Sequence, residues 1–353
     1  MKPIKATGYF FTGPNLPFEK KEFEINSLAD DEVIVQVAGC GLCHTDISFL
    51  TGQVKTKHEL PLILGHEISG TVIQTGKHAE QFKATKVVIP AVLPCGDCDI
   101  CHSGRDNVCQ AQLMPGNDFH GGFATHIKVP SQHLCVLPEP LGDIKLASFS
   151  VVADAMTTPY QSLKRSNLKD GDVAIVIGVG GVGTYMVQHG KNIGATIIAL
   201  DIDEKKLAHA KTMGASHTIC VKGMAEHEVK KAVRTLVKEN SLKKFGWKVF
   251  EMSGTAPGQM VAFSLLSFAG TLGVIGFTME KVNIRLSNVM AFDADVFGNW
   301  GCSPKYYIDV VNDVLTGKIN VVDNVEEHPL DDINKIIPLA LEHKLEKRVI
   351  FTP

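Results

Sequence analysis

The stretch IVIGVGGVG at residues 175–183 decides the fold of the second half of the chain. It joins an apolar run to a segment predicted to be a helix that begins near Tyr185. Its glycines have the spacing G-x-G-x-x-G, in which the first permits a tight turn, the second lets a pyrophosphate approach the backbone, and the third allows helix and strand to pack closely. We therefore expect a dinucleotide to bind at the helix N-terminus. The predicted contacts are Gly178, Gly180, Gly181, Val182 and Gly183.

An acidic residue at the end of the next apolar run supports this interpretation. The run TIIALD (196–201) ends in Asp201, 18 residues after Gly183 and near the expected offset of roughly 20. A carboxylate there accepts hydrogen bonds from the ribose 2′-hydroxyl and repels a 2′-phosphate, which favours NAD over NADP. On its own, the glycine pattern is also typical of a turn in any α/β domain.

The sequence on either side of this loop indicates two kinds of architecture. Up to about residue 155, short alternating or β-branched runs between turn residues predict a β-rich part. The strands expected there are 31–38, 68–73 and 86–91. Beyond it, apolar runs alternate with helical stretches, which predicts βαβ units and a parallel sheet. These runs are 173–179, 196–201 and 270–277, with helices at 203–213, 304–317 and 331–345 and a terminal strand in RVIFTP.

Composition excludes several classes of protein. The 353 residues include 35 Lys and Arg against 38 Asp and Glu, a net charge of −3, which argues against a nucleic-acid-binding surface. No apolar run approaches the roughly 18 residues that a membrane span needs. The N-terminus has no apolar segment of the kind found in secretory signals, so we expect a soluble, cytoplasmic protein.

Four of the nine cysteines form a compact motif. An odd count without an export signal makes a disulfide framework unfavourable, and Cys95, Cys98, Cys101 and Cys109 have the spacing C-x2-C-x2-C-x7-C. Such a loop can wrap four thiolates around one tetrahedral zinc ion and leave no open position, so the predicted role is structural. Redox cysteines or an iron–sulfur cluster remain alternatives. The other cysteines are interpreted as small apolar residues: Cys40, Cys135, Cys220 and Cys302.

A second set of metal-binding residue types is dispersed along the chain. GCGLCHTD (39–46) contains Cys43 and His44, LGHE (64–67) contains His66 and Glu67, and SVVADAMTTPY (150–160) contains Asp154. A lone histidine is usually a surface or satisfied core residue, but a thiolate, an imidazole and a carboxylate together leave zinc an open coordination position. With Cys43 and Asp154 as anions and His66 neutral, a site that holds Zn²⁺ would have a net charge of zero. Glu67 is either an alternative fourth ligand of the zinc ion or a residue that hydrogen-bonds to its ligands.

The order of these features resembles the zinc-containing medium-chain alcohol dehydrogenase family. The resemblance covers essentially the whole chain, including GHE, GGFATH (121–126) and RVIFTP. It implies a GroES-like catalytic domain at 1–157, a Rossmann NAD-binding domain at 158–298, and a return to the catalytic domain at 299–353. It also implies two zinc ions per chain, one of them a catalytic zinc bound by Cys43, His66 and Asp154.

The resemblance also implies roles for single residues. Thr45 matches the hydroxyl residue that hydrogen-bonds the substrate oxygen, and His44 the position beside the cofactor. Lys206 matches a basic residue near the adenosine ribose, and Arg348 a residue that contacts the pyrophosphate. Where several members carry a relay histidine, this chain has Ser48.

Four segments narrow the expected substrate. GYFFTGPN (8–15), GQVKTKHELPL (52–62), MPGNDFHGGF (114–123) and FGNWGCSPKYY (297–307) resemble members of the family that oxidise a cyclic hydroxyacyl-CoA with NAD⁺. The implied partner is therefore a small-molecule CoA thioester, and the family implies a homo-oligomer, either a dimer or a tetramer. Two alternatives remain: a zinc-dependent dehydrogenase of small alcohols or polyols, and an NAD-binding reductase-like protein with only a structural zinc.

Overall fold

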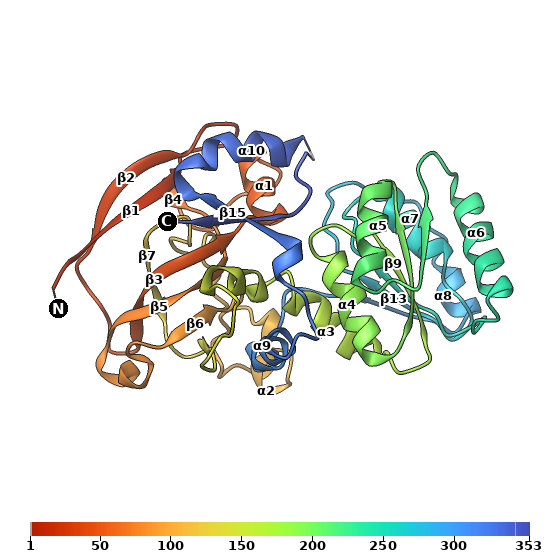
Figure 1. Ribbon diagram of the computed structural model, residues 1–353, viewed down its shortest axis with the longest axis horizontal. Coiled ribbons are helices and arrows are strands. Elements are labelled where there is room, and N and C mark those ends of the chain that lie inside the picture. The colour runs from red at the N-terminus through yellow and green to blue at the C-terminus, as the bar shows by residue number, and fades with distance from the viewer. Residues whose placement is uncertain (1, 343) are drawn as a thin grey trace. The chain divides into compact units, whose positions relative to one another are not determined.

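The computed structural model describes residues 2–342 and 344–353, which divide into two compact units (Figure 1). The first unit contains residues 1–157, 301–317 and 321–353, so both ends of the chain belong to it. The second contains residues 158–300 and 318–320. The first is rich in β-strands and the second is a parallel sheet with helices, which confirms the predicted α/β fold class.

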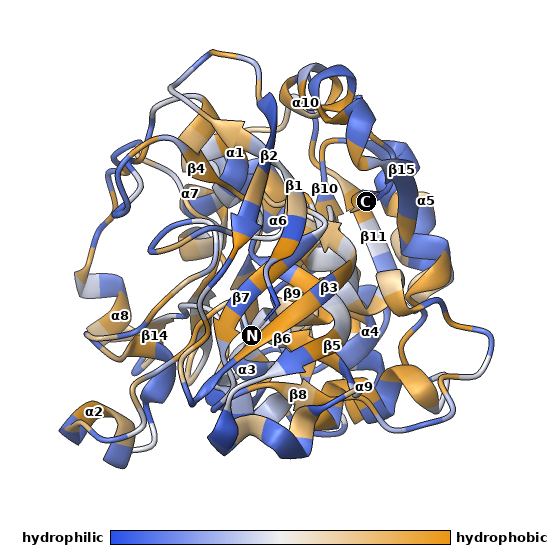
Figure 2. Cartoon of the chain, turned by 90° about the vertical axis from the view of Figure 1, so that its left-hand side faces the viewer, coloured by the Kyte–Doolittle hydropathy of each residue, from blue (hydrophilic) through white to orange (hydrophobic). Residues whose placement is uncertain are grey.

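The first unit is built on two sheets that share one apolar core. A three-stranded sheet has the order β2-β1-β4, and a seven-stranded sheet the order β15-β16-β3-β5-β6-β8, with β7 paired to β3. These strands are β1 (Ile4–Phe11), β2 (Glu19–Ile25), β3 (Glu32–Gly41), β4 (Leu62–Ile63), β5 (Glu67–Thr75), β6 (Lys86–Ile89), β7 (His126–Pro130), β8 (Cys135–Val136), β15 (Val325–Pro329) and β16 (Arg348–Thr352). β3 is largely hydrophobic (Figure 2), and its consecutive residues Val33, Ile34 and Val35 are fully buried. Because consecutive residues of a strand point to opposite faces, both faces of β3 are covered there.

Among the described residues, four short helices and several 3₁₀ turns complete the first unit. The helices are α1 (His44–Leu50), α2 (Asp99–His102), α9 (Tyr307–Leu315) and α10 (Ile333–Leu341), and the longest 3₁₀ segment is η3 (Leu146–Ala153). α9 and α10 confirm the helices expected after residue 300, with shorter bounds. The terminal strand β16 pairs antiparallel with β3 and parallel with β15.

The second unit is a six-stranded, all-parallel sheet with the order β11-β10-β9-β12-β13-β14. Its strands are β9 (Val173–Ile177), β10 (Thr196–Asp201), β11 (His217–Cys220), β12 (Lys248–Glu251), β13 (Thr271–Val274) and β14 (Asp295–Gly298). Its helices are α3 (Thr157–Ser166), α4 (Gly183–Ile193), α5 (Glu204–Met213), α6 (Glu226–Glu239), α7 (Ala256–Ser264) and α8 (Ser287–Ala291).

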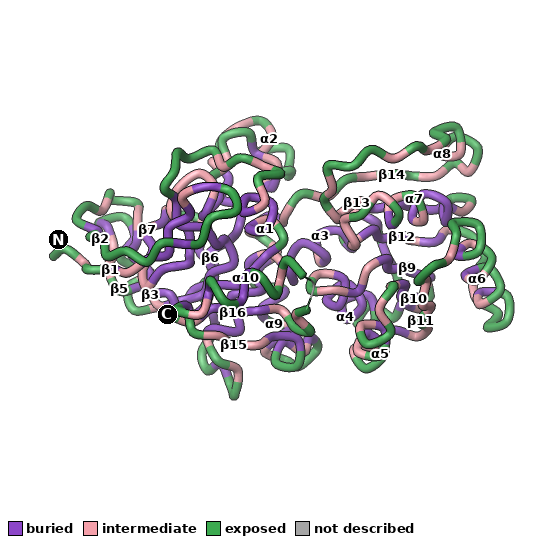
Figure 3. Tube along the Cα trace, turned by 90° about the horizontal axis from the view of Figure 1, so that it is seen from above, coloured by how far each residue is buried: buried purple, intermediate pink, exposed green. Residues whose placement is uncertain are grey.

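Helices cover both faces of this parallel sheet. Alternate residues of β9 enter two separate cores: Val173, Ile175 and Ile177 pack with α6 and α7, whereas Ala174 and Val176 pack with α4 and α5. In Figure 3, β9 and β12 are buried and α6 is largely exposed. This is the doubly wound arrangement expected from the continuous apolar runs. No helix within the described residues is long and apolar enough to cross a membrane.

Candidate active site and metal centres

The register of β3 and β5 brings the dispersed donor residues together. Gly41, near the end of β3, lies opposite Glu67 at the start of β5. Only a glycine fits there, since a Cβ on Gly41 would lie 2.1 Å from Glu67 Oε2. Two residues further, Cys43 is the N-cap of α1, and its Sγ lies within 4.8 Å of a ring nitrogen of His66. Asp154 follows the 3₁₀ segment η3 and completes the cluster.

The four donor atoms are spaced as ligands of one ion would be. Cys43, His66, Glu67 and Asp154 each offer a ligand atom, and these atoms lie within 4.8 Å of one another. Cys43 Sγ is 3.6 Å from Asp154 Oδ2, and His66 Nε2 is 3.7 Å from the same oxygen. Tetrahedral Zn²⁺ with bonds of about 2.3 Å to sulfur and about 2.0 Å to oxygen or nitrogen has ligand–ligand edges of about 3.3–3.5 Å. The donor set therefore fits zinc closely.

Buried negative charge around His66 also favours a cation. His66 is only 2% exposed, its Nε2 faces Asp154, and its Nδ1 lies 3.8 Å from Asp46 Oδ1. Burial opposes protonation of His66, but the Cys43 sulfur and the Asp46 carboxylate together raise its pKa well above the usual range. A cation shared by the donors would relieve this excess of negative charge.

Asp46 is a functional residue that the sequence analysis did not single out. Its carboxylate accepts hydrogen bonds from the backbone N–H groups of Cys43 (2.9 Å) and Gly65 (3.1 Å), and it is 1% exposed. It thereby orients the residues that precede α1 and β5, as carboxylates behind metal-bound histidines commonly do. The available signal was local: Asp46 stands three residues after the N-cap Cys43, in the position of a capping-box acid.

Glu67 forms a buried ion pair with Arg348. Arg348 Nε donates to Glu67 Oε2 at 2.9 Å, and its Nη2 donates to Oε1. Burial raises the pKa of the Glu67 carboxyl, and Arg348 opposes that shift. The structure thus places Arg348 beside the donor cluster, while its contact with a pyrophosphate stays a prediction.

Thr45 and His44 occupy the first turn of α1, directly after the potential ligand Cys43. Thr45 Oγ1 lies 3.9 Å from Cys43 Sγ, so the Thr45 hydroxyl is in contact with the donor cluster. His44 is exposed, and its carbonyl accepts a hydrogen bond from the Ser48 hydroxyl at 3.0 Å. Ser48 therefore closes a local turn of the helix at the position where a relay histidine would stand.

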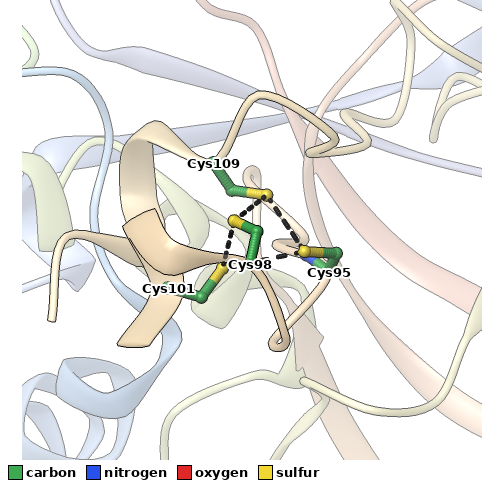
Figure 4. Close-up of side chains that lie close together, drawn as sticks. All are labelled: Cys95, Cys98, Cys101 and Cys109. Carbon is green, nitrogen blue, oxygen red and sulfur yellow. Dashed lines mark hydrogen bonds between the residues drawn. The ribbon is translucent and has the colours of Figure 1, made fainter. Parts of the chain in front are cut away.

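The four-cysteine cluster forms as predicted (Figure 4). The Sγ–Sγ distances are 3.5 Å for Cys98–Cys101 and Cys95–Cys109, 3.8 Å for Cys98–Cys109 and 3.9 Å for Cys95–Cys101. A tetrahedron with Zn–S bonds of about 2.3 Å has edges of about 3.8 Å. Backbone N–H groups of Asp97 and Cys98 lower the pKa of Cys95 to about 6, which favours the thiolate that a metal requires.

The remaining cysteines lie outside both donor clusters. Cys40, Cys135 and Cys302 are buried and Cys220 is partly exposed, and none forms a disulfide. The burial of Cys40, Cys135 and Cys302 agrees with the interpretation as small apolar residues, and that interpretation stays a prediction for Cys220.

The three glycines of the nucleotide loop occupy positions that match their predicted tasks. Gly178 has φ +84°. A Cβ on Gly183 would lie 1.9 Å from the Gly178 carbonyl oxygen, whereas a Cβ on Gly180 would meet nothing within 4 Å. The turn and the close packing thus require glycine, and Gly180 leaves open space for an approaching ligand. Gly181 is exposed and Val182 is the N-cap of α4, which begins two residues before the predicted start.

Asp201 is held at the end of β10 by backbone hydrogen bonds. Its Oδ2 accepts from Val179 N–H at 2.9 Å, and its Oδ1 accepts from Asp203 N–H at 3.0 Å. The acid is thus joined directly to the glycine loop, and each oxygen keeps a further lone pair for a ribose hydroxyl. Lys206 lies in the first turn of α5, immediately after this strand, and is partly exposed.

Comparison with known proteins agrees with this geometry. Residues 29–139 match the model described as "Alcohol dehydrogenase GroES-like domain", and residues 181–316 match "Zinc-binding dehydrogenase". An alcohol dehydrogenase of Geobacillus stearothermophilus is 29% identical over 340 residues, which cover 94% of each chain. A D-arabinose 1-dehydrogenase (NADP(+)) of Saccharolobus solfataricus is 27% identical over 96% of this chain and 95% of its own. The crystal structure of the alcohol dehydrogenase of Aeropyrum pernix has a TM-score of 0.87 at 26% identity and covers 98% of this chain and 100% of that chain.

A GroES-like unit with two metal-donor clusters and a Rossmann unit with a glycine loop define a zinc-type dehydrogenase. The two family models together match more than half of the chain, and the relatives match it over nearly its full length. The chain belongs to the zinc-type medium-chain alcohol dehydrogenase family, and it is an oxidoreductase that acts on CH–OH groups.

Proposed function

We propose that this dehydrogenase oxidises the ring hydroxyl of 6-hydroxycyclohex-1-ene-1-carbonyl-CoA to the 6-oxo enone, with NAD⁺ as hydride acceptor. This reaction belongs to the anaerobic breakdown of aromatic compounds through benzoyl-CoA. In it, the carbinol carbon loses a hydride to C4 of the nicotinamide and the hydroxyl loses a proton. The products are the conjugated ketone, NADH and H⁺.

The convergence of Cys43, His66 and Asp154 is the observation that carries the proposed chemistry. A reductase-like protein with only a structural metal has no use for a buried thiol, imidazole and carboxylate around one point, so this cluster argues against that alternative. A zinc ion held by these donors supplies Lewis-acid chemistry, which lowers the pKa of a hydroxyl group by many units. The anionic charges of Cys43 and Asp154 balance such an ion.

Thr45 would begin the transfer of the proton. The Thr45 hydroxyl, beside Cys43, accepts the hydrogen bond of the substrate alcohol and passes the proton outward. Because the Ser48 hydroxyl donates to the His44 carbonyl, it is already engaged and does not replace a relay histidine. The role of Thr45 rests on the family's pattern, in which His44 matches the position beside the cofactor, and the His44 side chain is exposed.

Asp201 supports NAD as the cofactor. Asp201 is the last residue of β10, and its carboxylate lies beside the glycine loop. There it would accept a hydrogen bond from a ribose hydroxyl and repel a 2′-phosphate. The substrate assignment rests on the likeness of residues 8–15, 52–62, 114–123 and 297–307 to dehydrogenases of this CoA thioester.

A dehydrogenase of small alcohols or polyols is the second candidate. It is supported by the names of the relatives, an alcohol dehydrogenase and a D-arabinose 1-dehydrogenase, both similar over nearly the whole chain. The same donor cluster would serve either substrate, because the metal contacts only the oxygen being oxidised.

Steady-state kinetics separate the two candidates. The purified protein is assayed with the cyclic hydroxyacyl-CoA, with ethanol and with a polyol, each with NAD⁺ and with NADP⁺. The proposal predicts the highest kcat/KM for the CoA thioester with NAD⁺. A higher kcat/KM for ethanol or the polyol would overturn the substrate assignment, and a preference for NADP⁺ would overturn the cofactor assignment.

We also propose that the chain forms a homo-oligomer, a dimer or a tetramer, as its family resemblance implies. β14 is the edge strand of the parallel sheet, and Val296 on this strand is 46% exposed. A second copy beside this edge would cover such apolar surface. Light scattering coupled to size-exclusion chromatography measures the state, and a monomeric mass would contradict this proposal.

A further inference from the structure

The segment Cys302–Tyr307 contacts the surroundings of both metal-donor clusters of the first unit. We propose that it couples the two metal centres, with Tyr307 as a positioning residue that places the ligand Asp154 and with Ser303 as its anchor on the cysteine loop. This inference rests on the proposed presence of two zinc ions per chain. It adds a role for residues that neither donor cluster contains.

Tyr307 holds the backbone directly before Asp154. The Tyr307 side chain is 1% exposed, and its hydroxyl donates a hydrogen bond to the carbonyl of Ala153. The same hydroxyl accepts a hydrogen bond from the N–H of Ala91 at 3.2 Å. Because Ala153 ends η3 and Asp154 follows at once, fixing this carbonyl fixes the peptide plane from which the Asp154 side chain projects.

Ser303 joins the same segment to the cysteine loop. Ser303 is 1% exposed, and its hydroxyl donates to Asp106 Oδ2 at 2.8 Å. Asp106 stands three residues before the cysteine ligand Cys109. Lys305 Nζ adds a longer hydrogen bond to the carbonyl of Gly104, 3.4 Å away, in the same loop. The loop is thus tied to the segment from two positions.

Ala91 gives Tyr307 a second connection to the cysteine loop. It stands four residues before Cys95, and the backbone between them is fixed by the paired N–H and C=O groups of Leu93 and Leu113, both at 2.9 Å. The Tyr307 hydroxyl therefore connects Ala153, which precedes Asp154, to Ala91, which precedes the four-cysteine cluster. These contacts join segments that lie 154 and 216 positions apart in sequence.

The cysteine loop has little apolar packing of its own, which gives this connection a consequence. Between Cys95 and Cys109 only Asn107 and Cys109 are buried, so little apolar packing holds the loop. A metal on the four thiols orders Asp106, and through Ser303 and Tyr307 it keeps Asp154 in place for the catalytic metal. By linkage, occupancy of either centre then raises the affinity of the other.

Metal release measures the coupling without any substrate. The zinc-loaded protein is mixed with excess chelator, and the two release phases are assigned with Asp154→Asn, which removes a ligand of the catalytic centre only. Tyr307→Phe keeps the ring and removes the hydroxyl, and we expect it to release the catalytic-centre zinc about 10-fold faster. In the Co²⁺-substituted protein, the same variant should shift the visible bands of the catalytic centre.

Two further variants make the result decisive. Ser303→Ala cuts the connection at the cysteine loop and should accelerate release from both centres. Tyr306→Phe removes a phenolic hydroxyl one residue away, leaves the Tyr307 bonds in place, and should match wild type. If Tyr307→Phe does not fold by circular dichroism, Ser303→Ala decides the question.

The outcomes separate this inference from the proposed function. Wild-type release and an unchanged Co²⁺ spectrum in Tyr307→Phe would overturn the coupling, as would an equal effect of Tyr306→Phe. A wild-type protein that binds fewer than two metal ions per chain would instead contradict the proposed function.

Discussion

Glu67, one of the four donors in the cluster around His66, forms a buried, bidentate ion pair with Arg348. Both oxygens of Glu67 accept hydrogen bonds from the guanidinium, and the two side chains are 7% and 0% exposed. Arg348 compensates the charge of Glu67 and so weakens the attraction of this carboxylate for a cation, although each of its oxygens keeps a further lone pair. The pair therefore favours Cys43, His66 and Asp154 as the three protein ligands, with the remaining position left for substrate.

Removing one partner of this pair should destabilise the first unit strongly. Arg348→Met leaves the Glu67 charge buried and uncompensated, so we expect the free energy of unfolding to fall by about 3–5 kcal/mol. The double variant Arg348→Met/Glu67→Gln should recover part of that loss, because no buried charge then remains. Urea unfolding followed by circular dichroism measures both. The exposed Arg285→Met is the control and should change stability by less than about 0.5 kcal/mol. Equal losses in the two arginine variants would contradict this account.

Features set by local spacing could be predicted from the sequence. The glycine loop, Asp201 and the four-cysteine cluster each lie within about one loop or one βαβ unit, so their spacing already restricts their geometry. The donors of the Cys43 cluster are different. Cys43 and Asp154 are 111 positions apart, so their residue types and the family resemblance connected them, and their spacing did not.

Residues that act through long-range packing escaped prediction. Asp46 is important because the pairing of β3 with β5 brings Gly65 and His66 against it. Tyr307 is important because α9 packs on η3, and nothing in the sequence near Tyr307 marks it as a partner of Ala153. Such contacts depend on tertiary structure, which spacing along one chain does not encode.

Asp201 should determine the choice between NAD and NADP. Asp201→Ala removes the acceptor for the ribose hydroxyls and the charge that repels a 2′-phosphate. We expect kcat/KM with NAD⁺ to fall by roughly 30-fold, equivalent to about 2 kcal/mol, with a smaller change for NADP⁺. Asp203→Asn is the control: Asp203 caps α5 through Lys205 N–H, so this variant should affect both cofactors alike. An unchanged ratio of the two kcat/KM values in Asp201→Ala would refute the assignment.

Glu251 should make the stability of the second unit depend on pH. It is fully buried at the end of β12, and burial raises the pKa of its carboxyl although the N–H groups of Ser253 and Gly254 oppose the shift. The folded state therefore holds the proton to higher pH than the unfolded state. The contribution of Glu251 to the free energy of unfolding is greatest below the pKa that its carboxyl has in the unfolded chain. This contribution is lost as the pH rises through the pKa of the carboxyl in the folded protein.

Glu251→Gln tests this dependence because the amide does not ionise. Relative to wild type, the variant should gain stability in urea unfolding as the pH is raised from 5 to 8. The exposed Glu239→Gln is the control and should show no such trend. A constant difference between wild type and Glu251→Gln at all pH values would show that the carboxyl does not titrate differently on folding.

Loss of a donor in the catalytic cluster should remove one metal ion and the activity together. For Cys43→Ser, metal analysis should find one zinc per chain in place of two, with turnover lowered by at least about 100-fold. Cys220→Ser is the matched control, since Cys220 lies in β11 outside both clusters, and it should retain both ions. Turnover near the wild-type level in Cys43→Ser would exclude this cluster as the catalytic centre.

Two glycines with open space around them should respond differently to alanine. A Cβ at Gly180 or at Gly298 meets nothing within 4 Å, and neither residue has a positive φ, so both alanine variants should keep the wild-type melting temperature. Only Gly180 lies in the loop where a pyrophosphate would approach the backbone, so Gly180→Ala should raise the Kd for NADH by about 10-fold or more, measured by fluorescence titration. Gly298→Ala, in β14, should bind NADH as wild type does. Undiminished binding by a folded Gly180→Ala protein would mean that the dinucleotide does not approach this loop.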